Sequence, residues 1–168
     1  MATLDLVLLV LRLWIGLVMV LHGLGHARNP DGTAKWFASM GFRRAELLAR
    51  GSGYGEIAMG LGLGVGLLTG IAAAGVVATM FTAFWAVHRF AGFFVYARPD
   101  EGYEYVATLA LLAASIAVLG PGSISLDAVL GWDTALAGTT GLLLALGGLA
   151  AGGAQVAVLW RKPQSEVE

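Results

Sequence analysis

The chain has 168 residues, of which 58% are hydrophobic and only 12% are charged, and its formal net charge is -1. Soluble domains carry about 25% charged residues, so this composition excludes an ordinary soluble domain, and the charge gives no electrostatic reason to expect a nucleic-acid partner. The chain has no cysteine, which excludes disulfides, thiolate catalysis and thiolate-bound zinc or iron–sulfur centres. Its apolar residues lie in runs of about 20, the length that crosses a bilayer as a helix.

The first apolar run predicts a membrane helix over residues 6–24. Its start lacks the positive region of a signal peptide and no small-residue cleavage site follows, so we interpret it as a retained helix. One broad face of this helix carries Arg12, Gly16, Gly23 and His26. Because an arginine at this depth is costly unless it finds a partner inside the bundle, we expect that face to contact protein.

The polar segment at residues 25–50 predicts a loop with one short helix. The turn sequence Asn-Pro-Asp-Gly at 29–32 precedes Thr33, a residue that commonly caps a helix. Gly41 is a plausible stop. We therefore expect a short helix over residues 33–40, lying at the membrane interface.

The apolar stretch at residues 53–96 is too long for one span and is interrupted near Gly70. We predict two helices, over residues 52–70 and 72–95. Small residues four positions apart let membrane helices approach closely. The first of these helices carries Glu56 in its first turns and then two such pairs, Gly60 with Gly64 and Gly62 with Gly66.

Two further membrane helices are expected, over residues 103–120 and 131–160. A stripe of the first contains Glu104, Thr108, Leu111 and Ser115. The second has Gln155 as its only strongly polar side chain, so we interpret it as a packing helix or a docking surface for a partner. Residues 161–168 form a polar tail.

Lysine and arginine positions predict the topology. They gather in the first loop, in the loop at residues 89–98 and in the tail, whereas the turn near residue 70 and the loop at 120–133 have none. Cytoplasmic loops carry an excess of these residues. With five spans, the N-terminus is therefore expected outside and the C-terminus in the cytoplasm.

This topology predicts a polar cluster at the cytoplasmic end of the bundle. The cluster contains His22, His26, Glu56, His88 and Glu104. Arg12 is expected deeper, towards the middle of the membrane.

Four interpretations of the cluster remain open from the residues alone. It is structural, with Arg12 held by a helix-end carbonyl or by Glu56. It is the polar end of a quinone site, since imidazoles and carboxylates carry protons near neutral pH. His22, His26 and His88 ligate haem or a metal, although the spacing is not that of known zinc motifs. It lines a path for an ion or small solute.

An ordered set of motifs extends over roughly residues 6–130. The set comprises Arg12, Gly16 and His22-Gly23; Phe37 and Gly41; Glu56 before the glycines at 60–66; His88 before Gly-Phe-Phe at 92–94; Gly-Tyr-Glu-Tyr at 102–105; and Gly-Pro-Gly at 120–122 before Asp127. In this order the motifs resemble those of the DoxX family of small bacterial and archaeal membrane proteins. One departure is His26, which stands near the place where members commonly carry a lysine.

The resemblance implies an all-α integral membrane protein, with a four-helix bundle over residues 1–130 and a fifth helix added at 131–160. DoxX relatives include membrane subunits linked to quinone reduction, to terminal oxidases and to oxidative-stress assemblies. We therefore expect a subunit of a redox or respiratory assembly in a prokaryotic inner membrane, contacting quinone at its cytoplasmic end and incomplete as an enzyme alone. The alternatives are a non-catalytic anchor subunit of a larger complex and a small-solute transporter.

The expected site combines proton-carrying groups with quinone contacts. The proton-carrying, catalytic groups are Glu56, His88 and Glu104, and the quinone contacts are Arg12, His22, His26 and Trp85. No metal site is predicted, and haem is left open.

Overall fold

The computed structural model describes residues 2–96 and 101–163, and almost all of its regular structure is helical. The elements in chain order are α1 (Ala2–Arg28), α2 (Pro30–Ser39), α3 (Ala45–Val65), α4 (Thr69–Ala86), a 3-10 turn (His88–Phe90), α5 (Glu104–Leu119), α6 (Leu126–Val129) and α7 (Gly138–Leu159). Within the described residues the only β-type pairing is an isolated antiparallel bridge between Phe42 and Trp160. The expected all-α class is therefore confirmed for this part of the chain.

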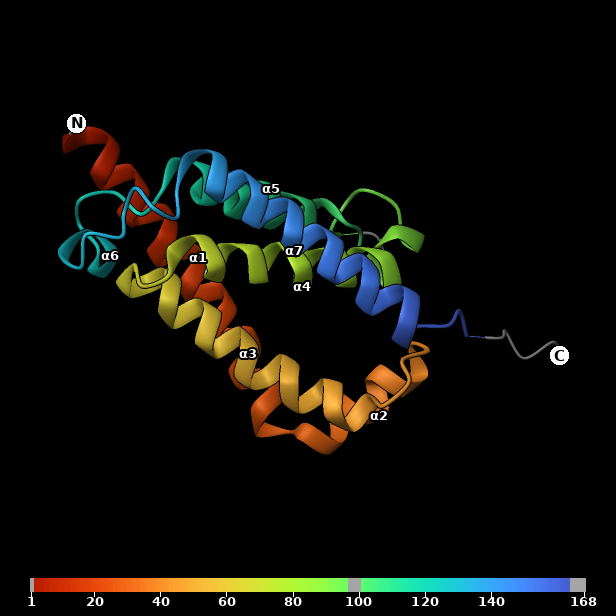
Figure 1. The fold of residues 1–168 in the computed structure, drawn as a ribbon. Helices are drawn as coiled ribbons and strands as arrows, with labels where there is room; N and C mark the ends of the chain where they lie inside the picture. Colours follow the sequence, from red (N-terminus) through yellow and green to blue (C-terminus); the bar gives the residue numbers. More distant parts are fainter. Residues whose placement is uncertain (1, 97–100, 164–168) are drawn as a thin grey trace, which may run out of the picture.

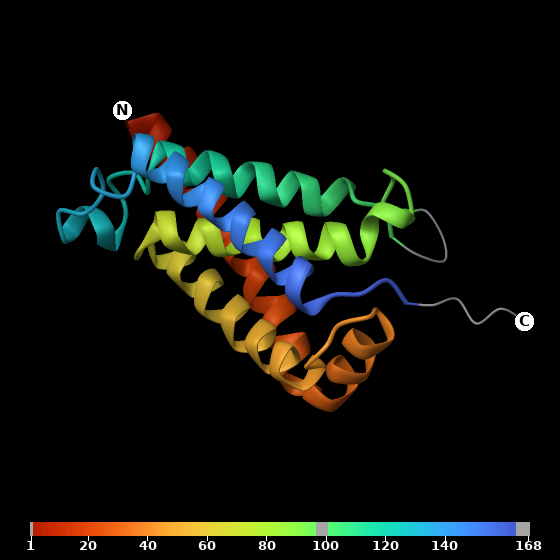
Figure 2. The ribbon, with the colours of Figure 1, turned by 45° about the vertical axis from the view of Figure 1, so that its right-hand side comes forward.

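The long helices form two groups that diverge along the molecule. Helix α1 packs along α3, while α4 packs between α5 and α7. The groups meet where α1 begins and α6 lies, and they separate toward α2 and the end of α7 (Figures 1 and 2). We call the first of these the loop end and the second the cavity end. The first and last described residues therefore lie at opposite ends of the bundle.

One carboxylate and one arginine hold the loop end together. Asp127 is 1% exposed and accepts hydrogen bonds from the backbone N–H groups of Leu68 (2.7 Å) and Thr69 (2.9 Å), at the start of α4. Arg12, which is fully buried, donates to the carbonyl oxygen of Leu63 at 3.1 Å and to that of Ile124. Because a buried guanidinium needs such acceptors, these contacts hold the loop at 120–133 against α1 and α3.

Glycine lets α1 and α3 cross at backbone contact. A Cβ atom at Gly16 would lie 2.6 Å from the carbonyl oxygen of Gly60, and a Cβ atom at Gly60 would lie 2.5 Å from that of Gly16. Real Cβ contacts do not reach such distances. By contrast, a Cβ atom at Gly64 would meet nothing within 4 Å. Of the predicted pair Gly60 and Gly64, only the first therefore requires the absence of a side chain.

Three helix boundaries differ by seven residues or more from the sequence prediction. Helix α3 begins at Ala45 rather than near residue 52, α4 ends at Ala86 rather than near 95, and α7 begins at Gly138 rather than near 131. Helix α4 ends because Val87 leaves the helical conformation, with a φ of -122° and a ψ of -69°. Backbone N–H groups of residues 102–104 then bond to carbonyl oxygens of residues 92–94. Part of the predicted loop, residues 97–100, lies outside the described residues, as do 164–168 of the predicted tail.

Three described helices are long and apolar enough to cross a membrane, namely α1, α4 and α7. Helix α5 is apolar but shorter, and α3 carries Glu46, Arg50 and Glu56. The molecule is thus a helical membrane protein, and a total of five spans stays a prediction.

Candidate functional site

Between the diverging helix groups lies a cavity of about 510 Å³, a size typical of small-molecule sites. Its walls come from α1, α2, α3, α4 and α5, with one residue from α7. Much of the wall is apolar, including Met19, Trp36, Phe37, Met59, Met80 and Leu109. The polar side chains on it are His22, His26, Ser52, Glu56, Thr79, Thr82, His88, Glu101, Tyr105 and Gln155.

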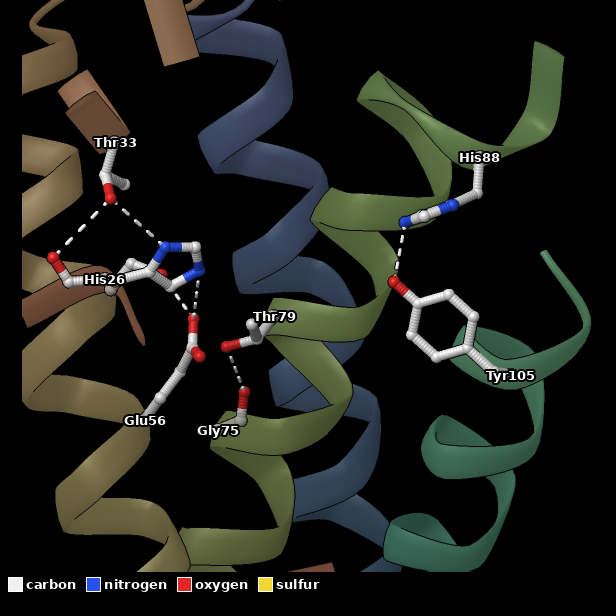
Figure 3. A network of polar contacts seen from close by, with 8 residues as sticks. His26, Thr33, Glu56, Gly75, Thr79, His88 and Tyr105 are labelled. Carbon is white, nitrogen blue, oxygen red and sulfur yellow. Dashed lines mark hydrogen bonds and ion pairs between the residues drawn. The ribbon is translucent and has the colours of Figure 1, made fainter. Parts of the chain in front are cut away.

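The first polar group on the wall joins α1 to α3. Glu56 is only 4% exposed, and its Oε1 atom accepts a hydrogen bond from Ser52 one turn earlier in α3. The same oxygen lies 3.8 Å from Nε2 of His26 (Figure 3). An almost fully buried carboxyl group therefore lies beside a partly exposed imidazole, whose side chain is 23% exposed.

Helix α2 holds the His26 ring in place. The Thr33 hydroxyl lies 3.4 Å from Nδ1 of His26. The Trp36 ring stacks on the imidazole at 6.5 Å between centroids, and Phe37 meets it edge-on at 5.8 Å. The short helix is therefore part of the site: it turns the Nε2 edge of His26 toward Glu56.

The second polar group joins the end of α4 to the start of α5. His88 is 7% exposed. Its Nδ1 atom lies 2.7 Å from the carbonyl oxygen of Glu101, and its Nε2 atom lies 2.8 Å from the Tyr105 hydroxyl. A carbonyl only accepts, so Nδ1 carries the hydrogen, and Nε2 of the neutral ring accepts from the phenol.

This arrangement makes the Tyr105 hydroxyl responsive to the charge of His88. If His88 takes up a proton at Nε2, the imidazolium donates at both nitrogens and the phenol oxygen becomes the acceptor. The phenol hydrogen is then free to donate to another molecule. The geometry therefore allows protonation of His88 to be transmitted to the cavity through Tyr105.

The two groups stand on different walls of the same cavity. In Figure 3, His26 and Glu56 lie on one side and the pair His88–Tyr105 lies on the other, with Thr79 of α4 between them. The Thr79 hydroxyl donates to Gly75 within its own helix at 3.1 Å. The cavity thus presents two separate proton-carrying groups across a largely apolar space.

The structure brings together some of the predicted site residues. His22, His26, Glu56 and His88 all line the cavity. Within the described residues, no group of three His, Asp or Glu side chains is arranged to hold a metal ion. Both ring nitrogens of His88 already have protein partners. His88 therefore offers no free nitrogen to the haem that we had left open.

Three predicted residues lie away from the cavity. Arg12 lies at the loop end, where it donates to the carbonyl oxygens of Leu63, near the end of α3, and of Ile124. A helix-end carbonyl is the partner that the structural interpretation expected. Trp85 lines a different, shallower groove against Trp160. The Glu104 carboxylate accepts from the backbone N–H of Val95 at 3.2 Å. The expected stripe through Glu104 faces outward, since Leu111 on it is 70% exposed.

Sequence reasoning missed Tyr105. Helix α5 buries Val106, Leu109, Ala113 and Ile116. At about 100° per residue, this stripe lies roughly 150° around the helix from the one we expected. Tyr105 borders this buried stripe and therefore reaches the cavity. The only sequence signal was its place in Gly-Tyr-Glu-Tyr at 102–105, and from that motif we predicted Glu104 as the site residue instead.

One of three comparisons with known proteins found a match. The DoxX family model matches residues 7–89, which span α1 to α4 and include every cavity histidine. No curated protein and no solved structure matches the chain. Over residues 7–89, the chain is therefore a DoxX-family membrane protein.

Proposed function

We propose that this protein binds quinone in the cavity between the two helix groups, as the membrane subunit of a redox assembly. The observation that carries the proposal is the pairing of an apolar cavity of about 510 Å³ with two histidine-containing groups on different walls. A quinone is a flat, apolar ring with two oxygens on opposite edges, and its reduction by two electrons consumes two protons.

Each of the two walls supplies one of the two protons. On one wall, His26 and Glu56 supply the proton for the first quinone oxygen, with Nε2 of His26 lying 3.8 Å from Oε1 of Glu56. On the other wall, Tyr105 donates to the second oxygen, and His88 resupplies its proton through Nε2, 2.8 Å from the phenol oxygen. Ser52 steadies the Glu56 carboxylate. The electrons come from a partner subunit that carries a redox cofactor.

The cavity walls also fit the apolar part of such a ligand. Methionines 19, 59 and 80 line the cavity, and flexible thioether side chains adapt to irregular apolar surfaces. Trp36 and Phe37 of α2 close it on one side. The ring would therefore be shielded from water while its oxygens meet the polar groups.

The proposal places the cavity end in the cytoplasm of a prokaryote, with the N-terminus outside. Arginines and lysines support this orientation. Those of the first loop, the 3-10 turn and the residues after α7 all lie at the cavity end, because Phe42 pairs with Trp160 and Arg89 lies over Trp85 and Trp160. The loop end carries Asp127 and Asp133 and no such residue between 120 and 137.

The test is the replacement Glu56→Gln, with Glu46→Gln as its matched control. Both acids belong to α3, but Glu46 is exposed in the first turn while Glu56 is 4% exposed. Wild-type protein extracted in a mild detergent should retain stoichiometric quinone, detected by mass spectrometry. Glu56→Gln should lower quinone-linked turnover in membranes about 10²-fold or more, the usual contribution of a positioned proton donor.

Glu46→Gln should leave turnover unchanged. Full turnover in Glu56→Gln, with normal insertion, would show that Glu56 is structural and would refute its role. Recovery of a large respiratory partner with no quinone bound to this chain would favour a non-catalytic anchor subunit instead. Solute uptake by vesicles containing this protein alone would favour transport.

A further inference from the structure

A second hollow lies at the cavity end, on the outer side of α4 and α7. It has a volume of about 310 Å³ and shares no residue with the cavity. Phe81 and Trp85 of α4 form one side of it. Gly153 and Val156 of α7 form the other, and the hollow ends at Trp160 and Arg161. Since both helices are long enough to cross a membrane, this groove runs along the direction of a lipid acyl chain.

Three cations gather where the groove ends. The guanidinium carbon of Arg89 lies 4.1 Å from the ring centre of Trp85 and 5.6 Å from that of Trp160. Arg161 follows Trp160 directly, and the Lys162 amine lies 6.0 Å from the Phe90 ring. Like charges that share one end of a groove repel one another, and an anion among them would offset that repulsion.

The described part of the chain provides no such anion. No salt bridge there involves any of these three side chains, since its only one joins His26 to Glu56. The Nε atom of Arg89 is buried and has no hydrogen-bond partner in the described residues. One nitrogen of Arg161 donates to the carbonyl oxygen of Ala157 at 2.9 Å, which leaves its other N–H groups available. Buried donors without acceptors are costly, so the arrangement is suited to an acceptor from outside the chain.

We propose that this groove binds one anionic phospholipid, with its phosphate between Arg89, Arg161 and Lys162 and an acyl chain between α4 and α7. Arginine is the side chain best matched to phosphate oxygens. Free phosphate would use only the cations, whereas a lipid also covers the apolar groove between Phe81 and Val156. The site is independent of the quinone proposal, because the two hollows share no residue.

Such a lipid would also brace the cavity from outside. Trp160 forms part of the groove and donates from Nε1 to the carbonyl oxygen of Met40 at 2.8 Å. The backbone N–H of Arg161 donates to Gly41 at 2.9 Å. These bonds tie the end of α7 to the segment after α2, so a lipid on Trp160 and Arg161 stabilises the cavity end as a whole.

The experiment titrates delipidated protein in detergent with dioleoylphosphatidylglycerol or dioleoylphosphatidylcholine and counts bound lipids by native mass spectrometry. The wild type should bind one phosphatidylglycerol in preference to phosphatidylcholine. The double variant Arg89→Gln/Arg161→Gln should bind it at least about tenfold more weakly, since each basic side chain near a lipid headgroup contributes about a fivefold change in affinity. The control Arg43→Gln/Arg50→Gln removes two exposed cations at the same end and should change affinity far less.

A further variant tests the proposed acyl-chain site without changing the charged side chains. Only Phe81, at 3.8 Å, lies within 4 Å of a Cβ atom at Gly153, so a Cβ atom fits there in ordinary contact, and the rest of the side chain in Gly153→Leu should occupy the groove. It should weaken lipid binding and leave the binding of inorganic phosphate unchanged. Equal loss in both double variants, equal binding of the two lipids, or unaltered lipid binding by Gly153→Leu would each overturn the proposal.

Discussion

Two glycines of α3, Gly60 and Gly64, have opposite surroundings where this helix crosses α1, so the effect of adding a methyl group at each can be predicted. A Cβ atom at Gly60 would lie 2.5 Å from the carbonyl oxygen of Gly16, whereas ordinary contact begins at 3.4 Å. In Gly60→Ala the two helices must therefore separate by about 0.9 Å. Overpacking of this kind costs about 1–3 kcal/mol.

Gly64→Ala is the matched control, since a Cβ atom there meets nothing within 4 Å. Both replacements gain the same helical preference of alanine over glycine, about 0.5–1 kcal/mol. Their difference in free energy of unfolding therefore isolates the helix contact. For a chain of this size, about 1–3 kcal/mol corresponds to roughly 2–12 °C in Tm.

The assay is thermal unfolding in detergent, followed by tryptophan fluorescence. Gly60→Ala should melt below the wild type, and Gly64→Ala should melt at or above it. Because Glu56 lies one turn before Gly60 and faces His26 of α1, the same replacement should weaken quinone binding. Equal melting temperatures for the two variants would refute the close crossing of α1 and α3.

Two further predictions concern single hydrogen bonds. Tyr105→Phe removes the hydrogen-bond partner of His88 Nε2. It should destabilise the protein by about 1–3 kcal/mol, since a buried acceptor loses its donor. It should also weaken the binding of decylubiquinone, measured by equilibrium dialysis. Asp127→Asn turns one of the two oxygens that accept from Leu68 and Thr69 into a donor facing a donor; a loss of at least about 1.5 kcal/mol is expected in chemical unfolding, and an unchanged midpoint would show that this cap contributes nothing.

Much of the fold could be predicted because its causes are local. Apolar runs of about 20 residues interrupted by turns specify membrane helices whatever surrounds them. For this reason the helical class and the break near Gly70 agree with the structure. The end of α4 could not be found in this way. Residues after Ala86 remain largely apolar, yet the chain leaves the helix at Val87, and residues 92–94 pair with 102–104 instead.

The sequence by itself determined which helix ends carry His22, His26, Glu56 and His88, since alternating helices return polar groups to the same side of a membrane. Only the tertiary structure decided which of the polar residues meet. Arg12 is drawn to carbonyl oxygens at the loop end, because a buried guanidinium takes whichever acceptors the packing provides. Tyr105 reaches His88 instead of Glu104, because the rotation of α5 is set by the residues it buries and not by its charged ones. The cavity lies between the pair α1 and α3 and the group of α4, α5 and α7. No local pattern encodes the angle between these groups, because it depends on how all of the helices pack.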